Sequence, residues 1–141
     1  MTIHPTALAD QRQAACADAL SRLKAAAAGP GARLSYEPDH PWLTEQLRLI
    51  TLSLTIGGAK FCEHLNAHPA SPRVVHAHAW TPGVLVCPDC TKFPYLIRDN
   101  TCDRCHRHSR RGLWTTIAAH GPVLFTYALC RTCHTEVDGP A

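Results

Sequence analysis

The hydrophobic positions of the first thirty residues recur with the period of an α-helix. Residues 1–30 are rich in alanine, carry apolar side chains near one face, and end at Gly29-Pro30-Gly31. Cys16 falls on this face beside Leu20 and Leu23 and has no cysteine or histidine near it in the sequence. We therefore predict a helix over 1–30 and interpret Cys16 as a small core residue.

Residues 39–58 carry a second helical pattern, with Asp39 as a plausible cap, Pro41 in the first turn and Gly57-Gly58 at the end. Two apolar stripes run along this helix: Leu43, Leu47, Ile50 and Leu54 form the first, and Leu49, Leu52 and Ile56 form the second. A helix that is apolar on two faces is expected to lie between two partners, here the first helix and the C-terminal region. If the first helix leaves it uncovered, the exposed stripe becomes a dimer surface.

Residues 59–141 change to short β-like runs separated by turn signals such as Thr81-Pro82-Gly83 and His120-Gly121-Pro122. The runs cover 73–80, 84–86, 93–98, 113–118 and 123–129. We predict an α+β protein with two parts: a helical N-terminal segment over 1–58 and a module of metal-stapled β-hairpins over 59–141.

Cysteine and histidine spacing supplies the chemistry of the second part. Four ligand pairs occur in order: Cys62 and His64, Cys87 and Cys90, Cys102 and Cys105, Cys130 and Cys133. A Cys-x-x-Cys turn directs both sulfurs to one centre, and two pairs complete the tetrahedron of a closed structural zinc site. Eight ligands therefore predict two Zn²⁺ ions per chain, which would help a chain with few aromatic residues to fold.

The pairing of these ligands leaves alternatives. Sequential sites are favoured, because each would enclose one hairpin, 73–86 or 113–129, each with a tryptophan in its first strand. A site formed by Cys87/Cys90 with Cys102/Cys105 is a second possibility, and a crossed arrangement is a third. A thiol–disulfide switch is a weaker interpretation, because three Cys-x-x-Cys pairs exceed what such a switch needs.

With these ligands in place, residues 62–138 resemble small bacterial zinc-ribbon or treble-clef zinc-finger proteins, most of them without an assigned function. The resemblance rests on the ligand spacing and does not extend to 1–58. It implies a double zinc ribbon and its metal, and it implies no reaction. A treble clef has a helix after its last ligand pair, and only 134–138 remain here before Gly139-Pro140, so the ribbon is the better likeness.

Other histidines do not form an obvious catalytic set. His76 and His78 alternate on one predicted strand, and either of them could replace His64 as a ligand. A half-solvated strand face is the simpler interpretation of this pair. Phosphate-binding glycine loops and paired carboxylates are not evident, so we expect no enzyme, and a metal-dependent enzyme is the less favoured alternative.

The net charge of the whole chain gives no support for nucleic-acid binding, whereas the local distribution of charge does. Seven thiolates subtract seven charges and two Zn²⁺ ions add four, which takes the formal net charge from +3 to zero. One cluster nevertheless stands out, with an aromatic residue close behind it: Arg104, Arg107, Arg110, Arg111 and Trp114. It could contact DNA or RNA, or it could merely offset the charge of a Cys₄ site in a solvated loop.

These observations favour a non-catalytic, zinc-stabilised binding module, as an accessory or regulatory nucleic-acid-binding protein. The alternative is a protein-interaction or assembly module that docks, or forms a homodimer, through residues 43–56. The N-terminus lacks a signal-peptide pattern, and the stretch 47–58 is too short to cross a bilayer. We therefore expect no membrane partner and a reducing, cytoplasmic location.

Overall fold

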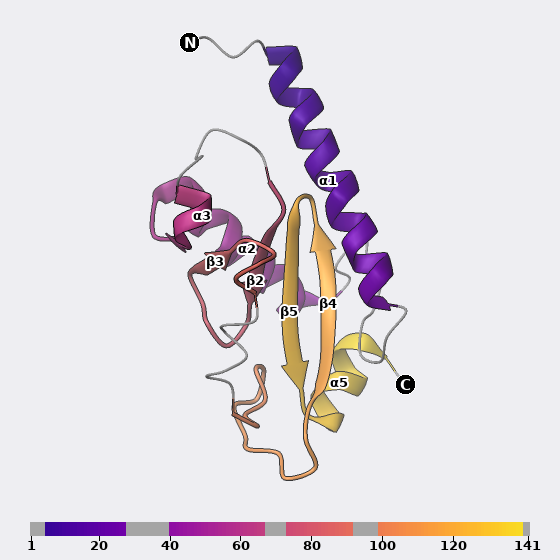
Figure 1. Cartoon of the computed structure of the whole chain (residues 1–141). Helices are drawn as coiled ribbons and strands as arrows, with labels where there is room; N and C mark the ends of the chain where they lie inside the picture. The colour runs from indigo at the N-terminus through magenta and orange to yellow at the C-terminus, as the bar shows by residue number, and fades with distance from the viewer. Residues whose placement is uncertain (1–4, 28–39, 67–72, 92–98, 140–141) are drawn as a thin grey trace.

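The computed structural model describes residues 5–27, 40–66, 73–91 and 99–139. Helices α1 (Pro5–Ala27) and α2 (Pro41–Ile56) come first, and a five-stranded sheet with two further helices follows (Figure 1). The later elements are β1 (Lys60–Phe61), α3 (Glu63–Asn66), β2 (Val75–His78), β3 (Val84–Val86), β4 (Trp114–His120), β5 (Val123–Leu129) and α5 (Arg131–Asp138). The predicted α+β class, with its helices N-terminal and its sheet C-terminal, is confirmed.

The two predicted hairpins are joined in one sheet. Strands β2 and β3 pair antiparallel, as do β4 and β5, and the strand order is β1-β3-β2-β5-β4. The junction is a parallel pairing of β2 with β5, in which Val75 lies opposite Val123 and His78 opposite Thr126. The two halves of the C-terminal part therefore share a continuous sheet.

One face of this sheet carries the main core. Leu43 and Leu47 of α2 and Val137 of α5 pack there against alternating strand residues, among them Ala77, Leu85, Ala118, Phe125 and Tyr127. Trp42 meets the Tyr127 ring edge-on, with ring centroids 5.5 Å apart. The first apolar stripe of α2 is therefore the one that covers the sheet.

Helix α1 covers the other face. Ala19 is fully buried and packs with Val74, Ala119 and Leu124, whose side chains alternate with those of the main core. The small alanine side chains let this helix lie close to β4 and β5. The expectation that α2 lies between α1 and the metal-binding region is wrong, because in the described residues α1 contacts the sheet on the face opposite α2.

The second stripe of α2 is consequently exposed. Leu49 is 47% exposed, Leu52 37% and Ile56 79%. His40 caps the helix by accepting a hydrogen bond at Nδ1 from the Trp42 amide (3.1 Å), whereas Asp39, the predicted cap, lies outside the described residues. Gly57 ends the helix at φ 82°, a conformation that favours glycine. In the described part of the chain, no helix combines the length and apolarity that crossing a membrane requires.

Candidate metal centres and basic end

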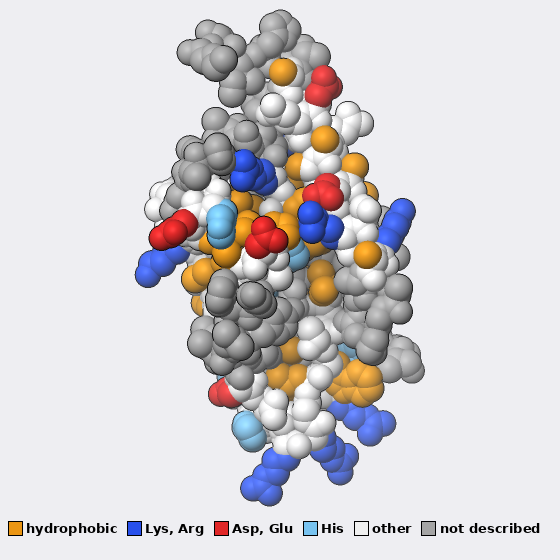
Figure 2. All heavy atoms as spheres, in the orientation of Figure 1, with side chains coloured by type: hydrophobic (Ala, Val, Ile, Leu, Met, Phe, Trp, Pro, Cys, Tyr) orange, Lys and Arg blue, Asp and Glu red, His pale blue; other side chains and the backbone are white. Residues whose placement is uncertain are grey.

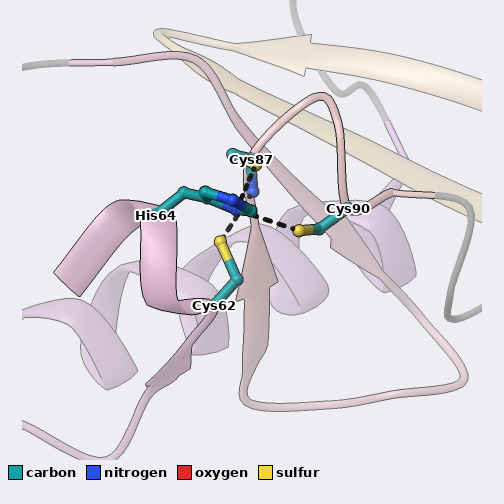
Figure 3. Close-up of side chains that lie close together, drawn as sticks. All are labelled: Cys62, His64, Cys87 and Cys90. Atoms are coloured by element: carbon teal, nitrogen blue, oxygen red, sulfur yellow. Dashed lines mark hydrogen bonds between the residues drawn. The ribbon is translucent and has the colours of Figure 1, made fainter. Parts of the chain in front are cut away.

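The first metal group consists of Cys62, His64, Cys87 and Cys90, whose ligand atoms all lie within 4.8 Å of one another. The four side chains point toward one centre (Figure 3). His64 Nδ1 lies 3.3 Å from Cys90 Sγ and 3.6 Å from Cys87 Sγ. An ion bound tetrahedrally through bonds of about 2.3 Å to sulfur sets its ligand atoms about 3.8 Å apart, so the group has the size of a zinc site.

Short elements hold this first metal group. Cys62 directly follows β1, which pairs in parallel with β3, and Cys87 directly follows β3. The Cys87 amide donates to Cys62 Sγ (3.3 Å), and the Cys90 amide closes the turn onto the Cys87 carbonyl (3.0 Å). The four-residue helix α3 then places His64, which is exposed, at the rim.

The second metal group consists of Cys102, Cys105, Cys130 and Cys133, also within 4.8 Å. Cys102 and Cys105 lie in one turn, which the His106 amide closes onto the Cys102 carbonyl (2.9 Å). Cys130 is the N-cap of α5, and Cys133 lies in its first turn. Cys102 and Cys133 are buried in the main core, whereas Cys105 is exposed.

Backbone pairing attaches the second metal group to the sheet. The Asp103 amide donates to the Ala128 carbonyl (3.0 Å), and the Ala128 amide donates to Asp103 Oδ2 (2.6 Å). Arg104 forms an ion pair with Glu136 of α5. The Cys102–Cys105 turn is therefore tied both to β5 and to the helix that carries the other two ligands.

Both groups hold one thiol that ionises easily. Burial opposes ionisation of Cys62, but hydrogen bonds from the Cys87 and Leu65 amides outweigh it and lower its pKa to about 7. Cys102 behaves alike: burial is outweighed by the amides of Cys105, Cys130 and Arg104, and its pKa falls to about 7. Backbone amides commonly donate such hydrogen bonds to metal-bound thiolates. Both groups are therefore suited to binding a cation.

In each group, one further thiol resists ionisation beside a neighbouring thiolate. Burial, followed by contacts with Cys87 and Cys62, raises the pKa of Cys90 to about 11. Burial and neighbouring Cys130 and Cys102 raise the pKa of Cys133 to about 12. A divalent cation would remove this repulsion, since it neutralises the thiolates that bind it.

The structure thus brings the eight predicted ligands together in the sequential arrangement, and each group flanks one hairpin. Cys16 belongs to neither group, and neither do His76 and His78. His78 is buried and shares a hydrogen bond between Nε2 and Thr91 Oγ1 (3.1 Å). His76 is half-buried, as a half-solvated strand face predicts, whereas His78 is more buried than predicted. Burial, then the charge of Arg22, lowers the pKa of His76 to about 4.

The predicted nucleic-acid residues do not all behave alike. Arg104 is ion-paired with Glu136, which raises its pKa, and it also interacts with Cys133. Arg107, Arg110 and Arg111 are exposed, and none of them forms an ion pair with an acidic residue among the residues described. We call these three the basic end; Figure 2 shows basic side chains gathered at the lower end of the molecule, where Figure 1 places the loop before β4.

Trp114 is 48% exposed and stacks on His134, with ring centroids 5.2 Å apart and planes 9° from parallel. An open groove beside this stack is lined by Arg111 and by Arg131 at the start of α5. Sequence reasoning missed Arg131 because it lies twenty residues beyond Arg111. The antiparallel pairing of β4 with β5, in which Trp114 lies opposite Leu129, brings the two arginines to the same end of the sheet.

Comparison of the chain with protein-family models, curated proteins and solved structures finds no match. The resemblance to zinc-ribbon proteins over residues 62–138 stays a prediction. The two metal groups and the basic end are the features of the described residues that bear on function.

Proposed function

We propose that the chain is a zinc-stabilised binding module with two structural Zn²⁺ ions, one in each metal group. The single observation that carries this proposal is the convergence of four Cys or His ligand atoms at each of two centres. Thiolate and imidazole donors in a four-ligand set favour zinc over the oxygen-seeking cations. Four protein ligands also leave no open position for a reacting molecule, which supports a structural role. The helix α5 (Arg131–Asp138) starts at the last ligand pair, so the likeness to a treble clef stands beside the likeness to a zinc ribbon.

Cobalt substitution tests the ligand sets. Co²⁺ in place of zinc should give the absorption of tetrahedral thiolate sites at two equivalents per chain. Cys90→Ser, in the first metal group, should reduce uptake to one tightly bound equivalent, whereas Cys16→Ser, the matched control outside both groups, should keep two. Equal loss in both variants, or octahedral spectra, would overturn the assignment.

We infer further that the module contacts nucleic acid through its basic end, as an accessory or regulatory factor. The competing explanation, that these arginines only offset the charge of the Cys₄ site, is better met by Arg104. Arg104 interacts with Cys133 and with Glu136. Among the described residues, none of the three arginines of the basic end forms an ion pair with an acidic side chain. Arginines held on a rigid metal-stapled turn are suited to phosphate contacts.

Charge reversal tests this inference. Arg107→Glu, Arg110→Glu and Arg111→Glu together should abolish a salt-sensitive mobility shift of DNA or RNA, because three cationic contacts to phosphate become repulsive. The matched control reverses three exposed basic residues elsewhere, Arg12, Lys24 and Lys60, with the same change in net charge. Equal loss of binding in both triple variants would show non-specific charge attraction and sink the assignment to the basic end.

A second function, protein assembly through α2, is favoured by the exposed apolar stripe Leu49, Leu52 and Ile56, with Phe61 also exposed (38%). Self-association should then increase with concentration in sedimentation velocity, and Leu52→Asp with Ile56→Asp should remove it. A chain that sediments as a monomer at every concentration and that retains no protein partner would rule this function out.

A further inference from the structure

Trp114 and His134 form a stacked pair beside the basic end. His134 covers one face of the indole in a near-parallel stack, yet 48% of Trp114 remains exposed. The uncovered face of the indole is therefore open to solvent. A large aromatic face held open at the start of a strand is costly to leave exposed and is a suitable surface for another planar ring.

His134 itself is held firmly. Its Nδ1 lies 3.0 Å from Asp138 Oδ2, and the Asp138 side chain is only 4% exposed. Asp138 also accepts from Tyr127 Oη (2.6 Å) and from Thr116 Oγ1 (3.2 Å), so strands β4 and β5 both fix its carboxylate. The imidazole behind Trp114 is thus set by the core, and the indole rests on a preorganised support.

The groove next to this pair has a cationic lining that suits the phosphates of a nucleic-acid backbone. Its lining includes Arg111, Arg131 and Thr132, and no acidic residue of the described chain lines it. Ser109 and Thr135 line it too, but their hydroxyl groups donate to the Gly112 and Arg131 carbonyls (2.7 and 2.9 Å). Arginine and hydroxyl donors are the groups that contact phosphate and sugar oxygens. An aromatic face and a cationic track therefore lie side by side.

We propose that this groove binds single-stranded nucleic acid, with a base stacked on the open face of Trp114 and the adjoining phosphates at Arg111 and Arg131. This proposal rests on the nucleic-acid function inferred above and specifies its substrate class. Bases of a duplex are stacked on each other and cannot reach a flat indole, whereas unpaired bases can. Because every base has a π-face, the groove tolerates many sequences.

The test compares binding of a labelled twenty-nucleotide single strand with binding of a duplex of equal length by fluorescence anisotropy. The wild type should bind the single strand more tightly. Trp114→Ala should weaken single-strand binding about ten-fold or more, and Trp114→Phe should restore most of it, because a phenyl ring still stacks. Arg131→Gln should weaken single-strand binding several-fold. Each variant is first checked for the metal content of the wild type.

Two outcomes overturn this proposal in different ways. If the wild type binds the single strand but Trp114→Ala binds it equally well, or if the duplex binds more tightly, the stacking proposal fails and the basic end keeps its inferred function. If the wild type binds neither oligonucleotide at low salt, the nucleic-acid function fails and the stacking proposal fails with it. Quenching of tryptophan fluorescence by the single strand, lost in Trp114→Phe, separates stacking from phosphate contact alone.

Discussion

The two metal groups use the same ligand geometry on very different supports. The first metal group is held by the two-residue strand β1 and the four-residue helix α3. Its buried ligands Cys87 and Cys90 form a small cluster with Leu65 and Val86, separate from the main core. The second adjoins the seven-residue strand β5, buried along its whole length, and supplies Cys102 and Cys133 to the main core. A metal bound in the first group would therefore organise a local region, whereas one bound in the second would help to hold the whole fold together.

The largest effect is expected from breaking the second metal group. Cys102→Ser removes a ligand that is 0% exposed and leaves a polar hydroxyl in the main core. Structural zinc contributes about 10 kcal/mol or more to folding, as much as a small domain's total stability. The variant should no longer unfold cooperatively when unfolding is monitored by near-ultraviolet circular dichroism. A variant that keeps a cooperative transition would show that the second metal is dispensable.

A smaller, local effect is expected from His64→Ala in the first metal group. Metal content should fall from two to one, and the amides of β1, β3 and the Cys87–Cys90 turn should lose protection from hydrogen exchange, whereas those of β4 and β5 keep it. His64→Cys is the matched control and should keep two metals, because a thiolate can replace the imidazole. Global loss of protection in His64→Ala would contradict the contrast between the two supports.

Next in size is the hydrogen-bond network that links α5 to the sheet. Tyr127→Phe removes a donor to the buried Asp138 carboxylate without changing the packing of the ring. We expect a loss of about 1–3 kcal/mol in the free energy of unfolding, measured with urea at saturating zinc. Thr135→Ala, which removes a hydroxyl on the exposed side of the same helix, should change it by about 0.5 kcal/mol or less.

At neutral pH, His76 should give the smallest effect of these changes, because its contribution appears only as a dependence on pH. Its pKa is about 4 in the fold and 6.5 in the unfolded chain, so the unfolded chain takes up the proton first as the pH falls. The stability contributed by the neutral imidazole is complete above pH 6.5 and is lost progressively toward pH 4. His76→Gln should flatten this part of the profile in unfolding curves at fixed zinc. An unchanged slope would contradict the burial of His76.

The sequence predicted the features that depend on local chemistry. Helical periodicity and Gly57 located α2 closely, and the repeat of ligand pair, hairpin and ligand pair favoured the sequential pairing while two other pairings stayed open. Long-range features were not accessible: local patterns predicted neither the parallel pairing of β2 with β5 nor the packing of α1 and α2 on opposite faces of the sheet. The same limit hid the ion pair of Arg104 with Glu136 and the position of Arg131 beside Arg111.

Native mass spectrometry of the purified chain is the most direct test of the two-metal account. We predict two zinc ions per chain at neutral pH, two in Cys16→Ser, and one in His64→Ala with the second metal group still loaded. A wild-type chain that carries fewer than two ions after zinc is supplied, or whose Cys87–Cys90 and Cys102–Cys105 pairs are found as disulfides under reducing conditions, would contradict it.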